Sequence, residues 1–457
     1  MVHRIAVVGT GISGLAAAWA LHRRPDRFDV QVYEKDAHVG GNAVTIDVPQ
    51  RDGSTATVDV AVTVCVPKVY HHVIAAMEAC GVERVPTEYS VAVHHGGDVH
   101  AHGPDSSLRT RLAADFDRFA QVLAVLNRFN MPVTNPTILR AAANPFNYVS
   151  IGRVLDLWRV SGEFRVKVLK PMVVSFALAA DVFAMPASLF SRYLGFLDVE
   201  RPSPMLTWRG STRAFFGNLT ASFADRIHTG REVTRIVRDS GGVTVHDASG
   251  GAERFDQVIL ACNADHALRL LSEPSRAERA ILGRVRYETA VHGDVVVHTD
   301  ATVLPDDQAV AAGRSTVVRQ YGAAADNYEV TYVLNNLQPW LDGTACLATY
   351  NAAGPIDDDA VLARTSFRHV VHDVRQNAFL ANVMRFVQGG RRTWFCGAHT
   401  MVNSQEHCFV SGLAVARQLG ADYPFPDNAP AVRWFNFYGR TAHGRSFRRV
   451  ADNSADR

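Results

Sequence analysis

The sequence has few cysteines, and their spacing fits neither a metal site nor a disulfide framework. Six cysteines are scattered over 457 residues without a C-x-x-C pair. Structural zinc needs closely spaced ligands, and small secreted domains pair their cysteines. We therefore expect reduced thiols, no metal ion and a cytoplasmic location.

An excess of charge of either sign is also missing. The chain has 47 Lys and Arg against 45 Asp and Glu, which gives a net charge of +2. Proteins that bind nucleic acids usually carry a strongly basic face. We therefore expect no nucleic acid partner.

Long apolar runs are absent as well. The most apolar stretch, residues 173–189, contains Asp181 and Pro186 and falls short of the about 20 residues that cross a bilayer. The first apolar run starts at Ile5 and ends at Gly9, too early for the core of a secretion signal. We expect no transmembrane segment, and a buried helix over residues 173–189 that lines a core or cavity. Asp181 is either a hydrogen-bonded core acid or a group that meets a substrate.

The length of the chain indicates two domains. The chain is longer than a single core usually grows, and 47% of its residues are hydrophobic and 20% charged, as in globular enzymes. The apolar spacing predicts a helical cap over residues 109–130 and 136–197. Short apolar runs separated by glycine turns predict a β-meander over residues 232–259 that ends in the strand 258–261.

Further elements are predicted toward the C-terminus. Apolar and β-branched runs predict strands at residues 295–298, 330–334 and 393–396, and a helix at residues 410–419. Beyond Pro430 the chain is rich in Arg, Asn and Ser, and we expect it to fray.

The chain opens with a buried strand, a glycine turn, a helix and a second strand. Residues 5–8 are a continuous apolar run, and Gly9, Gly11 and Gly14 form G-x-G-x-x-G directly after it. The first glycine allows the tight turn, the second lets backbone approach a pyrophosphate, and the third lets the helix pack close. The start of the helix offers N–H groups and its positive dipole end to phosphates. This pattern predicts a Rossmann-type βαβ unit that binds a dinucleotide.

An acidic residue follows the second strand at the distance that this motif requires. Glu34 lies about 20 residues after Gly14, where a carboxylate accepts hydrogen bonds from ribose hydroxyls. An acid at this position disfavours a 2′-phosphate. Gly40, Gly41 and Asn42 come soon afterwards.

With this glycine pair the sequence resembles the FAD-containing amine oxidase superfamily, which includes phytoene desaturases and protoporphyrinogen oxidases. The resemblance implies FAD, with the glycine pair bringing backbone against the cofactor. Val233 lies in a V-x-x-I segment whose backbone meets the adenine in that family. A strand followed by Gly397 and Ala398, with Gly412 in the last helix, resembles the family's C-terminal flavin segment. The candidate cofactor-binding residues are therefore Gly9, Gly11, Ser13, Gly14, Glu34, Lys35, Gly40, Gly41, Asn42, Val233, Gly397, Ala398 and Gly412.

A closer resemblance is to bacterial amine-oxidase-like proteins, predicted NAD/FAD-binding proteins often associated with cyclopropane fatty acid synthesis genes. The similar segments are residues 258–265, 297–305, 330–338 and 394–398. The resemblance implies an α/β fold in which a Rossmann-type FAD-binding domain is interleaved with an α+β substrate domain. We expect the FAD-binding domain at residues 1–65, 205–265 and 388–425, the substrate domain at 66–204 and 266–387, and a C-terminal tail at 426–457.

The sequence departs from the family pattern at two places. Residues 59–62 read Asp-Val-Ala-Val where the family usually has D-x-G-F, which puts a backbone contact with the cofactor in doubt. Residues 404–408 stand where the family has F-H-E-D-G and keep only Glu406 in register. A catalytic histidine of relatives is therefore lost here, or its role has moved to His407.

The catalytic candidates are two pairs of polar residues. His399 and Glu406 belong to the loop before the flavin-facing helix. A structural role for Glu406, as a residue that caps this loop, is an equally good interpretation. His298 and Asp300 form a second candidate acid-base pair. The cysteines near the flavin segment are interpreted as small apolar residues, so we expect FAD to be bound non-covalently.

These residues favour a flavin-dependent oxidoreductase. We expect hydride transfer from an apolar or amphipathic small molecule, such as a lipid, polyene or amine, to flavin N5, with O2 or another acceptor regenerating the cofactor. Two alternatives stay open: a flavin-dependent double-bond isomerase of an unsaturated fatty acid, and a non-catalytic flavin-binding scaffold. The sequence implies no oligomeric state.

Overall fold

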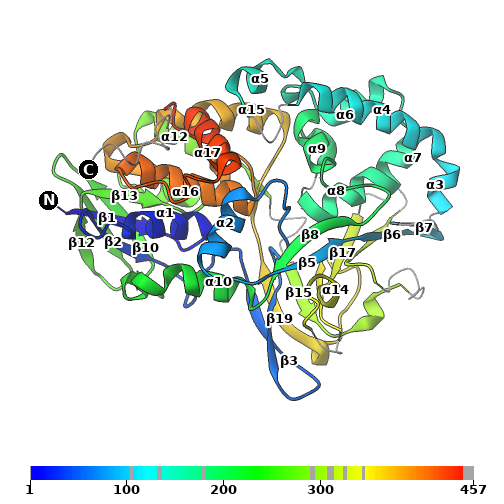
Figure 1. The fold of residues 1–457 in the computed structure, drawn as a ribbon, viewed down its shortest axis with the longest axis horizontal. Coiled ribbons are helices and arrows are strands. Elements are labelled where there is room, and N and C mark those ends of the chain that lie inside the picture. Colours follow the sequence, from blue (N-terminus) through cyan, green and yellow to red (C-terminus); the bar gives the residue numbers. More distant parts are fainter. Residues whose placement is uncertain are drawn as a thin grey trace.

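A five-stranded parallel sheet organises one end of the molecule (Figure 1). The computed structural model describes residues 2–102, 107–130, 136–177, 179, 181–288, 294–305, 313–322, 327–341 and 345–445. The sheet has the strand order β21 (Thr393–Phe395), β13 (Gln257–Leu260), β1 (His3–Val8), β2 (Phe28–Tyr33) and β9 (Ile227–His228). Its strands therefore come from three segments that lie far apart in the sequence.

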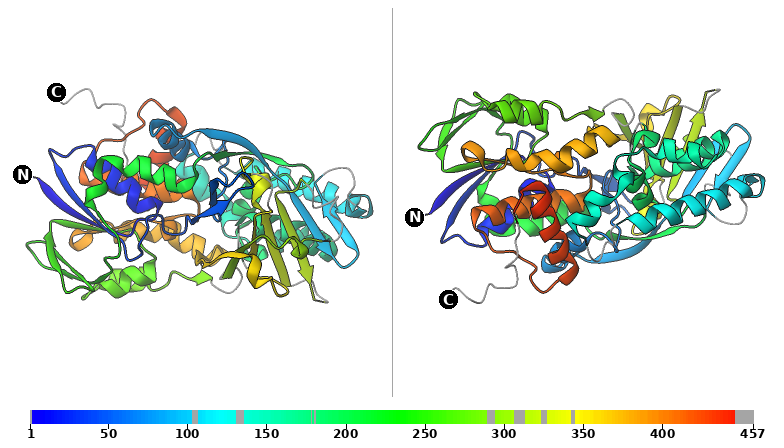
Figure 2. Two further views of the ribbon diagram at one scale, coloured as in Figure 1. Left: turned by 90° about the horizontal axis from the view of Figure 1, so that it is seen from below. Right: turned by 90° about the horizontal axis from the view of Figure 1, so that it is seen from above.

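Both faces of this sheet are covered, which explains its continuous apolar strands. Ile5 and Val7 point into one core with helices α1 (Ile12–His22) and α16 (Gln405–Leu419), while Ala6 and Val8 point into a second core. Successive side chains of a strand point to opposite faces of the sheet, so a strand whose sheet is covered on both faces has apolar residues at successive positions. Figure 2 shows α1 and α16 on one side of the blue strands and the green meander on the other.

The meander is confirmed, except for its last strand. β10 (Val233–Arg238), β11 (Val243–Asp247) and β12 (Ala252–Phe255) form an antiparallel sheet. The expectation that residues 258–261 continue it is wrong, because β13 instead lies between β1 and β21 in the parallel sheet. Val258, Ile259 and Leu260 are fully buried, as a central parallel strand requires.

The other end of the molecule consists of a mixed sheet and the helical cap (Figure 1). The seven-stranded sheet has the order β19 (Val361–Ser366), β15 (Asp294–His298), β18 (Leu347–Tyr350), β17 (Asn327–Val333), β16 (Thr316–Tyr321), β6 (Val91–His95) and β7 (Asp98–Ala101). The cap contains α3 (Ser107–Arg111), α4 (Ala113–Phe129), α5 (Ile138–Ala143), α6 (Ile151–Leu157), α7 (Gly162–Phe164), α8 (Lys170–Ala177) and α9 (Ala187–Tyr193). Two-stranded sheets pair β3 (Thr45–Pro49) with β4 (Thr55–Asp59), β5 (Arg84–Tyr89) with β8 (Ser203–Trp208), and β14 (Tyr287–Glu288) with β20 (His369–Val370).

The predicted helical cap and the strands at 295–298 and 330–333 are confirmed, but the single helix over residues 173–189 is not. The structure has α8 and α9 in this stretch, separated by a short 3-10 turn at Val182–Ala184. Asp181 matches neither interpretation made for it. It is exposed and caps the turn by accepting hydrogen bonds from the backbone N–H groups of Phe183 and Ala184.

The C-terminal region is more ordered than the sequence predicts. Helix α16 begins at Gln405 and not at residue 410, because Ser404 caps it by accepting from the N–H of His407. The expectation that the chain frays beyond Pro430 is wrong for α17 (Ala429–Ala442), which buries Phe435 and Tyr438. Pro430 lies in the first turn of this helix, where its missing N–H costs nothing.

Within the described residues, no helix combines the length and apolar character needed to cross a bilayer. All six cysteines are free thiols.

Candidate functional site

A cavity of about 1360 Å³ opens at the carboxyl edge of the parallel sheet. The residues that directly follow three of its strands line the cavity, namely Gly9 after β1, Glu34 after β2 and Ala261 after β13. Gly397, the second residue after β21, also lines it. Ligands of open α/β sheets bind at this edge. Ordinary ligand pockets measure about 300–1,000 Å³, so this cavity has room for a dinucleotide and a second molecule.

The glycine loop after β1 has the geometry of a phosphate site. Gly9 has a φ of +104°, and a Cβ there would lie 3.0 Å from the carbonyl oxygen of Ala261. At Gly11 the φ is −57°, and none of the described atoms lies within 4 Å of the place of a Cβ. Gly11 therefore keeps open a space beside the start of α1, where backbone N–H groups and the helix dipole attract phosphate.

Glu34 is fixed by the same loop. Its Oε2 accepts hydrogen bonds from the Thr10 N–H at 2.9 Å and the Thr10 hydroxyl at 2.6 Å, and its Oε1 accepts from the Asp36 N–H at 3.1 Å. A carboxylate offers about four acceptor sites, so capacity for a ribose hydroxyl remains. The Thr10 hydroxyl also accepts from the Gly40 N–H at 3.3 Å, which ties the acid to the second glycine pair.

The second glycine pair closes against the first loop. Gly41 has a φ of +60°, and a Cβ on it would lie 3.0 Å from the Cα of Gly11. Further predicted residues also line the cavity, namely Ser13, Lys35, Gly40, Asn42, Val233, Gly397 and Ala398. The open space at Gly11, the oriented acid and the two close glycine loops fit FAD.

Gly14 and Gly412 are not part of the cavity lining. A Cβ on Gly14 would lie 2.0 Å from the Gly9 carbonyl oxygen, and one on Gly412 would lie 2.0 Å from the Ser13 carbonyl oxygen. These two glycines therefore let α1 pack against the loop and α16 pack against α1. Their link to the cofactor is through packing, since they hold the two helices that shape its site.

Glu406 lies outside the cavity lining, although the sequence offers it as a catalytic group. Its carboxylate accepts from the N–H groups of His72 and Val73, each at 2.9 Å, and contacts the Nδ1 of His72 at 2.6 Å. These residues form the first turn of α2 (His71–Ala79). Burial raises the pKa of Glu406, but the contacts with His72 and the two N–H groups outweigh burial and hold that pKa below its ordinary value. This placement fits a structural cap of α2 and does not fit proton exchange with a substrate.

His298 and Asp300 are not brought to the site either. His298 is buried in β15, where its Nε2 lies 2.8 Å from the hydroxyl of Thr349. Asp300 caps a short 3-10 turn by accepting from the N–H and hydroxyl of Thr302. Neither residue lines the cavity, so the suggested acid-base pair does not fit this geometry.

His399 does line the cavity. Burial lowers the pKa of its imidazole to about 4, so the ring is neutral near pH 7. Its Nε2 is buried and has no hydrogen-bond partner among the described residues. His399 therefore contributes a neutral ring to the cavity lining, with a buried nitrogen that no described residue satisfies.

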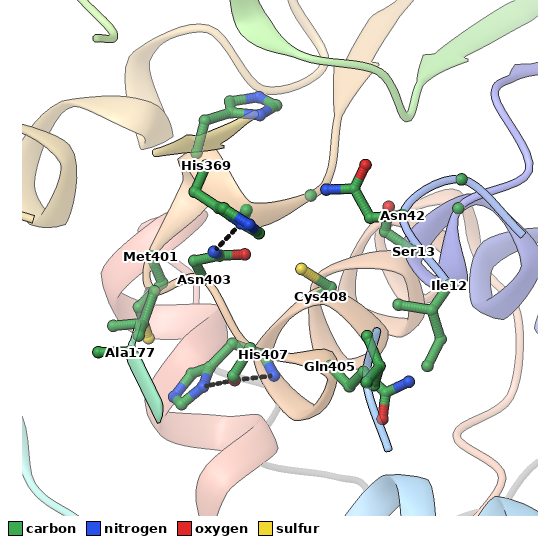
Figure 3. Close-up of a pocket in the computed structure, with 18 of the residues that line it drawn as sticks. Ile12, Ser13, Asn42, Ala177, His369, Met401, Asn403, Gln405, His407 and Cys408 are labelled. Carbon is green, nitrogen blue, oxygen red and sulfur yellow. Dashed lines mark hydrogen bonds between the residues drawn. The ribbon is translucent and has the colours of Figure 1, made fainter. Parts of the chain in front are cut away.

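A second histidine at the site, His369, was missed in the sequence. The N–H of Asn403 donates to His372 Nε2 at 3.1 Å, and the side-chain amide of Asn403 contacts His369 Nδ1 at 2.8 Å. Because the amide nitrogen donates to Nδ1, the proton of the neutral His369 ring sits on Nε2, which is buried and has no partner among the described residues. Burial lowers the pKa of His369 to about 4. Figure 3 shows this pair across the cavity from Ser13 and Asn42.

The segment between the Gly397 turn and the first turn of α16 lies along the cavity, as the sequence predicts. Met401, Val402, Asn403, Ser404, Gln405, His407 and Cys408 all line it. His407 Nδ1 lies 2.7 Å from the Ser404 hydroxyl (Figure 3). Burial raises the pKa of the Cys408 thiol to about 12, so the thiol stays protonated. The positive dipole end of α16 also faces this region.

Aromatic rings form the remaining wall, and no sequence pattern identified them. They come from β5, α8, α9 and the segment after it, from β17 and β18, and from the residue that follows β19: Tyr89, Phe176, Tyr193, Phe196, Tyr332, Tyr350 and Phe367. The hydroxyls of Tyr89 and Tyr332 both donate to the carbonyl oxygen of Ser175, at 2.6 and 2.5 Å. Helix α17 adds Trp434 and Phe437. With these hydroxyls satisfied by protein, this wall is predominantly apolar toward a ligand.

Comparisons with known proteins agree with this architecture. A family model described as flavin containing amine oxidoreductase matches residues 12–321. No curated protein sequence matches the chain.

Solved structures of similar fold include three enzymes. A CLA-producing fatty acid isomerase from P. acnes has 18% identity and a TM-score of 0.64, over 91% of this chain and 98% of that chain. Wild-type putrescine oxidase bound to putrescine has 14% identity and a TM-score of 0.65, over 92% and 99%. Cyclohexylamine oxidase from Brevibacterium oxydans IH-35A has 15% identity and a TM-score of 0.61, over 92% and 100%. At these identities the likeness concerns the fold, and the predicted α/β class is confirmed.

Proposed function

The chain belongs to the family of flavin containing amine oxidoreductases, and from that premise we propose that it oxidises an apolar or amphipathic small molecule. It is an FAD-dependent oxidoreductase, held to its cofactor by the residues around Gly11, Glu34 and Gly41. The bound FAD supplies the chemistry, since flavin N5 accepts a hydride from a substrate carbon and an acceptor such as O2 takes the electrons onward.

One observation carries this proposal: the glycine loops and the aromatic wall line the same cavity. A molecule that packs against the rings of Tyr332 and Tyr350 shares an enclosed space with the cofactor loops. Burial of apolar surface against aromatic side chains favours apolar ligands. Acidic lining residues among those described, Glu34, Asp36 and Glu232, belong to the dinucleotide side, so an amine substrate has no carboxylate to pair with at the aromatic wall.

The histidines supply hydrogen bonds without charge. His369 and His399 are neutral near pH 7, because burial lowers both pKa values to about 4. Both rings line the cavity, and each has a buried Nε2 without a partner among the described residues. Neutral side chains add no charge here, while the surrounding apolar wall excludes the water that competes with hydride transfer.

The test is anaerobic reduction of the holoenzyme by a panel of long-chain alkenes, fatty acids and amines. We expect loss of the oxidised flavin absorbance with at least one of them, and a product lighter by two hydrogens. An altered product of unchanged mass points to an isomerase instead, the activity named for one protein of similar fold. Reduction by a hydrophilic sugar or nucleotide, with no response to apolar compounds, refutes the proposal. Gly11→Val protein without flavin is the control for contaminating activity.

A further inference from the structure

Arg192 differs from the other arginines of the cavity. Arg231 pairs with Asp247, and Arg269 and Arg368 both pair with Asp265. Arg192 lies on α9 and lines the cavity, yet its guanidinium makes no ion pair or hydrogen bond with any residue that the structure describes. Its guanidinium therefore carries a positive charge without a protein partner.

The cavity offers Arg192 no carboxylate. The acidic residues of the described lining, Glu34, Asp36 and Glu232, lie beside the glycine loops and the meander. Burial alone lowers the pKa of Arg192 to about 10, with no acid to oppose the shift, and the guanidinium is still charged at neutral pH. His407 adds no second positive charge, because burial and the neighbouring Arg192 lower its pKa to about 4. A charge that is partly withdrawn from water and has no partner is costly, so an anion bound beside the Arg192 guanidinium offsets part of that cost.

The surroundings of Arg192 are polar on one side and aromatic on the other. Ser188 lies one turn earlier on the same face of α9, and its hydroxyl donates to Asn147 at 2.5 Å. Asn130 donates to the hydroxyl of Ser191 at 2.8 Å and accepts from the amide of Asn144 at 3.0 Å. All of these residues line the cavity.

On the other side, Tyr193 and Phe196 continue from α9 into the aromatic wall, with ring centroids 5.8 Å apart. Phe176 stacks beside them, 5.4 Å from Phe196. The Arg192 guanidinium therefore lies between a polar surface and an apolar surface of the cavity.

We propose that Arg192 binds the carboxylate of an amphipathic substrate whose hydrocarbon part packs against the aromatic wall. A single guanidinium without a second buried cation matches a monoanion, and its planar fork matches a carboxylate. This inference rests on the proposed function, because it names the substrate class of the same cavity. It makes carboxylic acids the substrates and places amines among the poor ligands.

The experiment measures equilibrium binding to the oxidised holoenzyme through the change in flavin absorbance. The probes are oleate, oleamide and oleylamine, which share one chain and differ in the charge of the head group. Truncating one partner of a buried charge pair usually weakens binding by at least about 30-fold. We therefore expect oleate to bind at least about 30-fold more tightly than oleamide, with oleylamine weakest.

Two variants and a control test the role of Arg192 itself. Arg192→Met should abolish the preference for oleate over oleamide, and Arg192→Lys should keep part of it, with FAD content unchanged in both. Arg153→Met is the matched control, since Arg153 is exposed on the neighbouring helix α6 and does not line the cavity. If Arg192→Met fails to fold, two measurements decide the question: the ratio of oleate to oleamide affinity in the wild type, and the decrease of this ratio in Arg192→Lys.

Three results overturn the proposal: equal binding of oleate and oleamide by the wild type, an unchanged ratio in the Arg192 variants, or an altered flavin spectrum in these variants with the ratio intact. The last result assigns Arg192 to the cofactor. Because binding is read without turnover, an Arg192-dependent preference for oleate stands even where no apolar compound reduces the flavin. That outcome removes the proposed oxidation and leaves the carboxylate site.

Discussion

Gly11→Val is expected to weaken FAD binding while leaving the polypeptide folded. The backbone at Gly11 has a φ of −57°, which any residue adopts, and no atom of the described chain lies within 4 Å of the new Cβ. The valine methyl groups therefore enter the cavity, in the space that the loop keeps open for phosphate. The protein itself meets no clash.

The size of the effect follows from overpacking. Forcing extra methyl groups into a filled site costs about 1–3 kcal/mol, which weakens FAD binding by about 5- to 150-fold. The apo protein should be as stable as the wild type or more stable by about 0.4–1 kcal/mol, because replacing glycine reduces the freedom of the unfolded chain. The variant thus separates cofactor affinity from folding.

The assay titrates deflavinated protein with FAD and follows flavin fluorescence, with thermal unfolding of the apo forms beside it. Gly14→Ala is the contrasting variant: its single methyl group would lie 2.0 Å from the Gly9 carbonyl oxygen, so it should lower the apo melting temperature. Wild-type FAD affinity in Gly11→Val refutes the position of the phosphate site. An unfolded Gly11→Val protein refutes the open space at the loop.

Three further predictions concern the buried polar groups. Glu406→Gln should lower the free energy of unfolding by about 3 kcal/mol, because it breaks a buried pair with His72, and turnover per bound flavin should be retained. A variant that is as stable as the wild type but has lost turnover contradicts this prediction. Burial lowers the pKa values of His369, His399 and His407 to about 4, below the ordinary 6.5. As the pH falls, these histidines therefore take up protons in the unfolded chain before they do so in the folded protein. The free energy of unfolding, measured with urea, should therefore decrease as the pH is lowered from 6.5 to 4, by up to about 3 kcal/mol for each histidine. A free energy of unfolding that does not change over this pH range contradicts the burial of these histidines in the neutral form. His369→Phe keeps a ring of similar size but removes the Nδ1 that contacts the side chain of Asn403 in the cavity lining. The KM of the substrate should rise about 2- to 10-fold at unchanged FAD content, and an unchanged KM removes His369 from substrate binding.

The sequence predicts the dinucleotide half well because its signals are local. Gly9, Gly11 and Glu34 lie within one βαβ unit, and the conformation of each follows from the turn it occupies. The length of α16 was underestimated for a local reason too, since the capping serine at 404 was not used as a helix start. The polar composition beyond Pro430 predicts fraying, whereas the aromatic residues within that segment are buried on one face of α17.

The chemistry of the other half depends on contacts that no local pattern contains. Glu406 has the right position in the family pattern, but the partner that fixes its role, His72, lies 334 residues away. Arg192 is one of many arginines in the sequence, and only the absence of an acid around it in three dimensions distinguishes it. His369 contributes to the cavity lining through its contact with Asn403, which lies 34 residues later.

The arrangement of the parallel sheet also determines when this protein can acquire its cofactor during synthesis. β1 pairs with β13, and α1 packs against α16 through Gly412, so the nucleotide loop near the N-terminus is supported by residues made near the end of translation. At roughly 5–20 residues per second, the ribosome reaches α16 only after about 20–80 s. Until then the glycine loop lacks its supporting helix, and the apolar faces of β1 and α1 need protection from aggregation. Such high contact order implies slow folding, and a chain that stops before residue 405 should remain colourless whatever the supply of FAD.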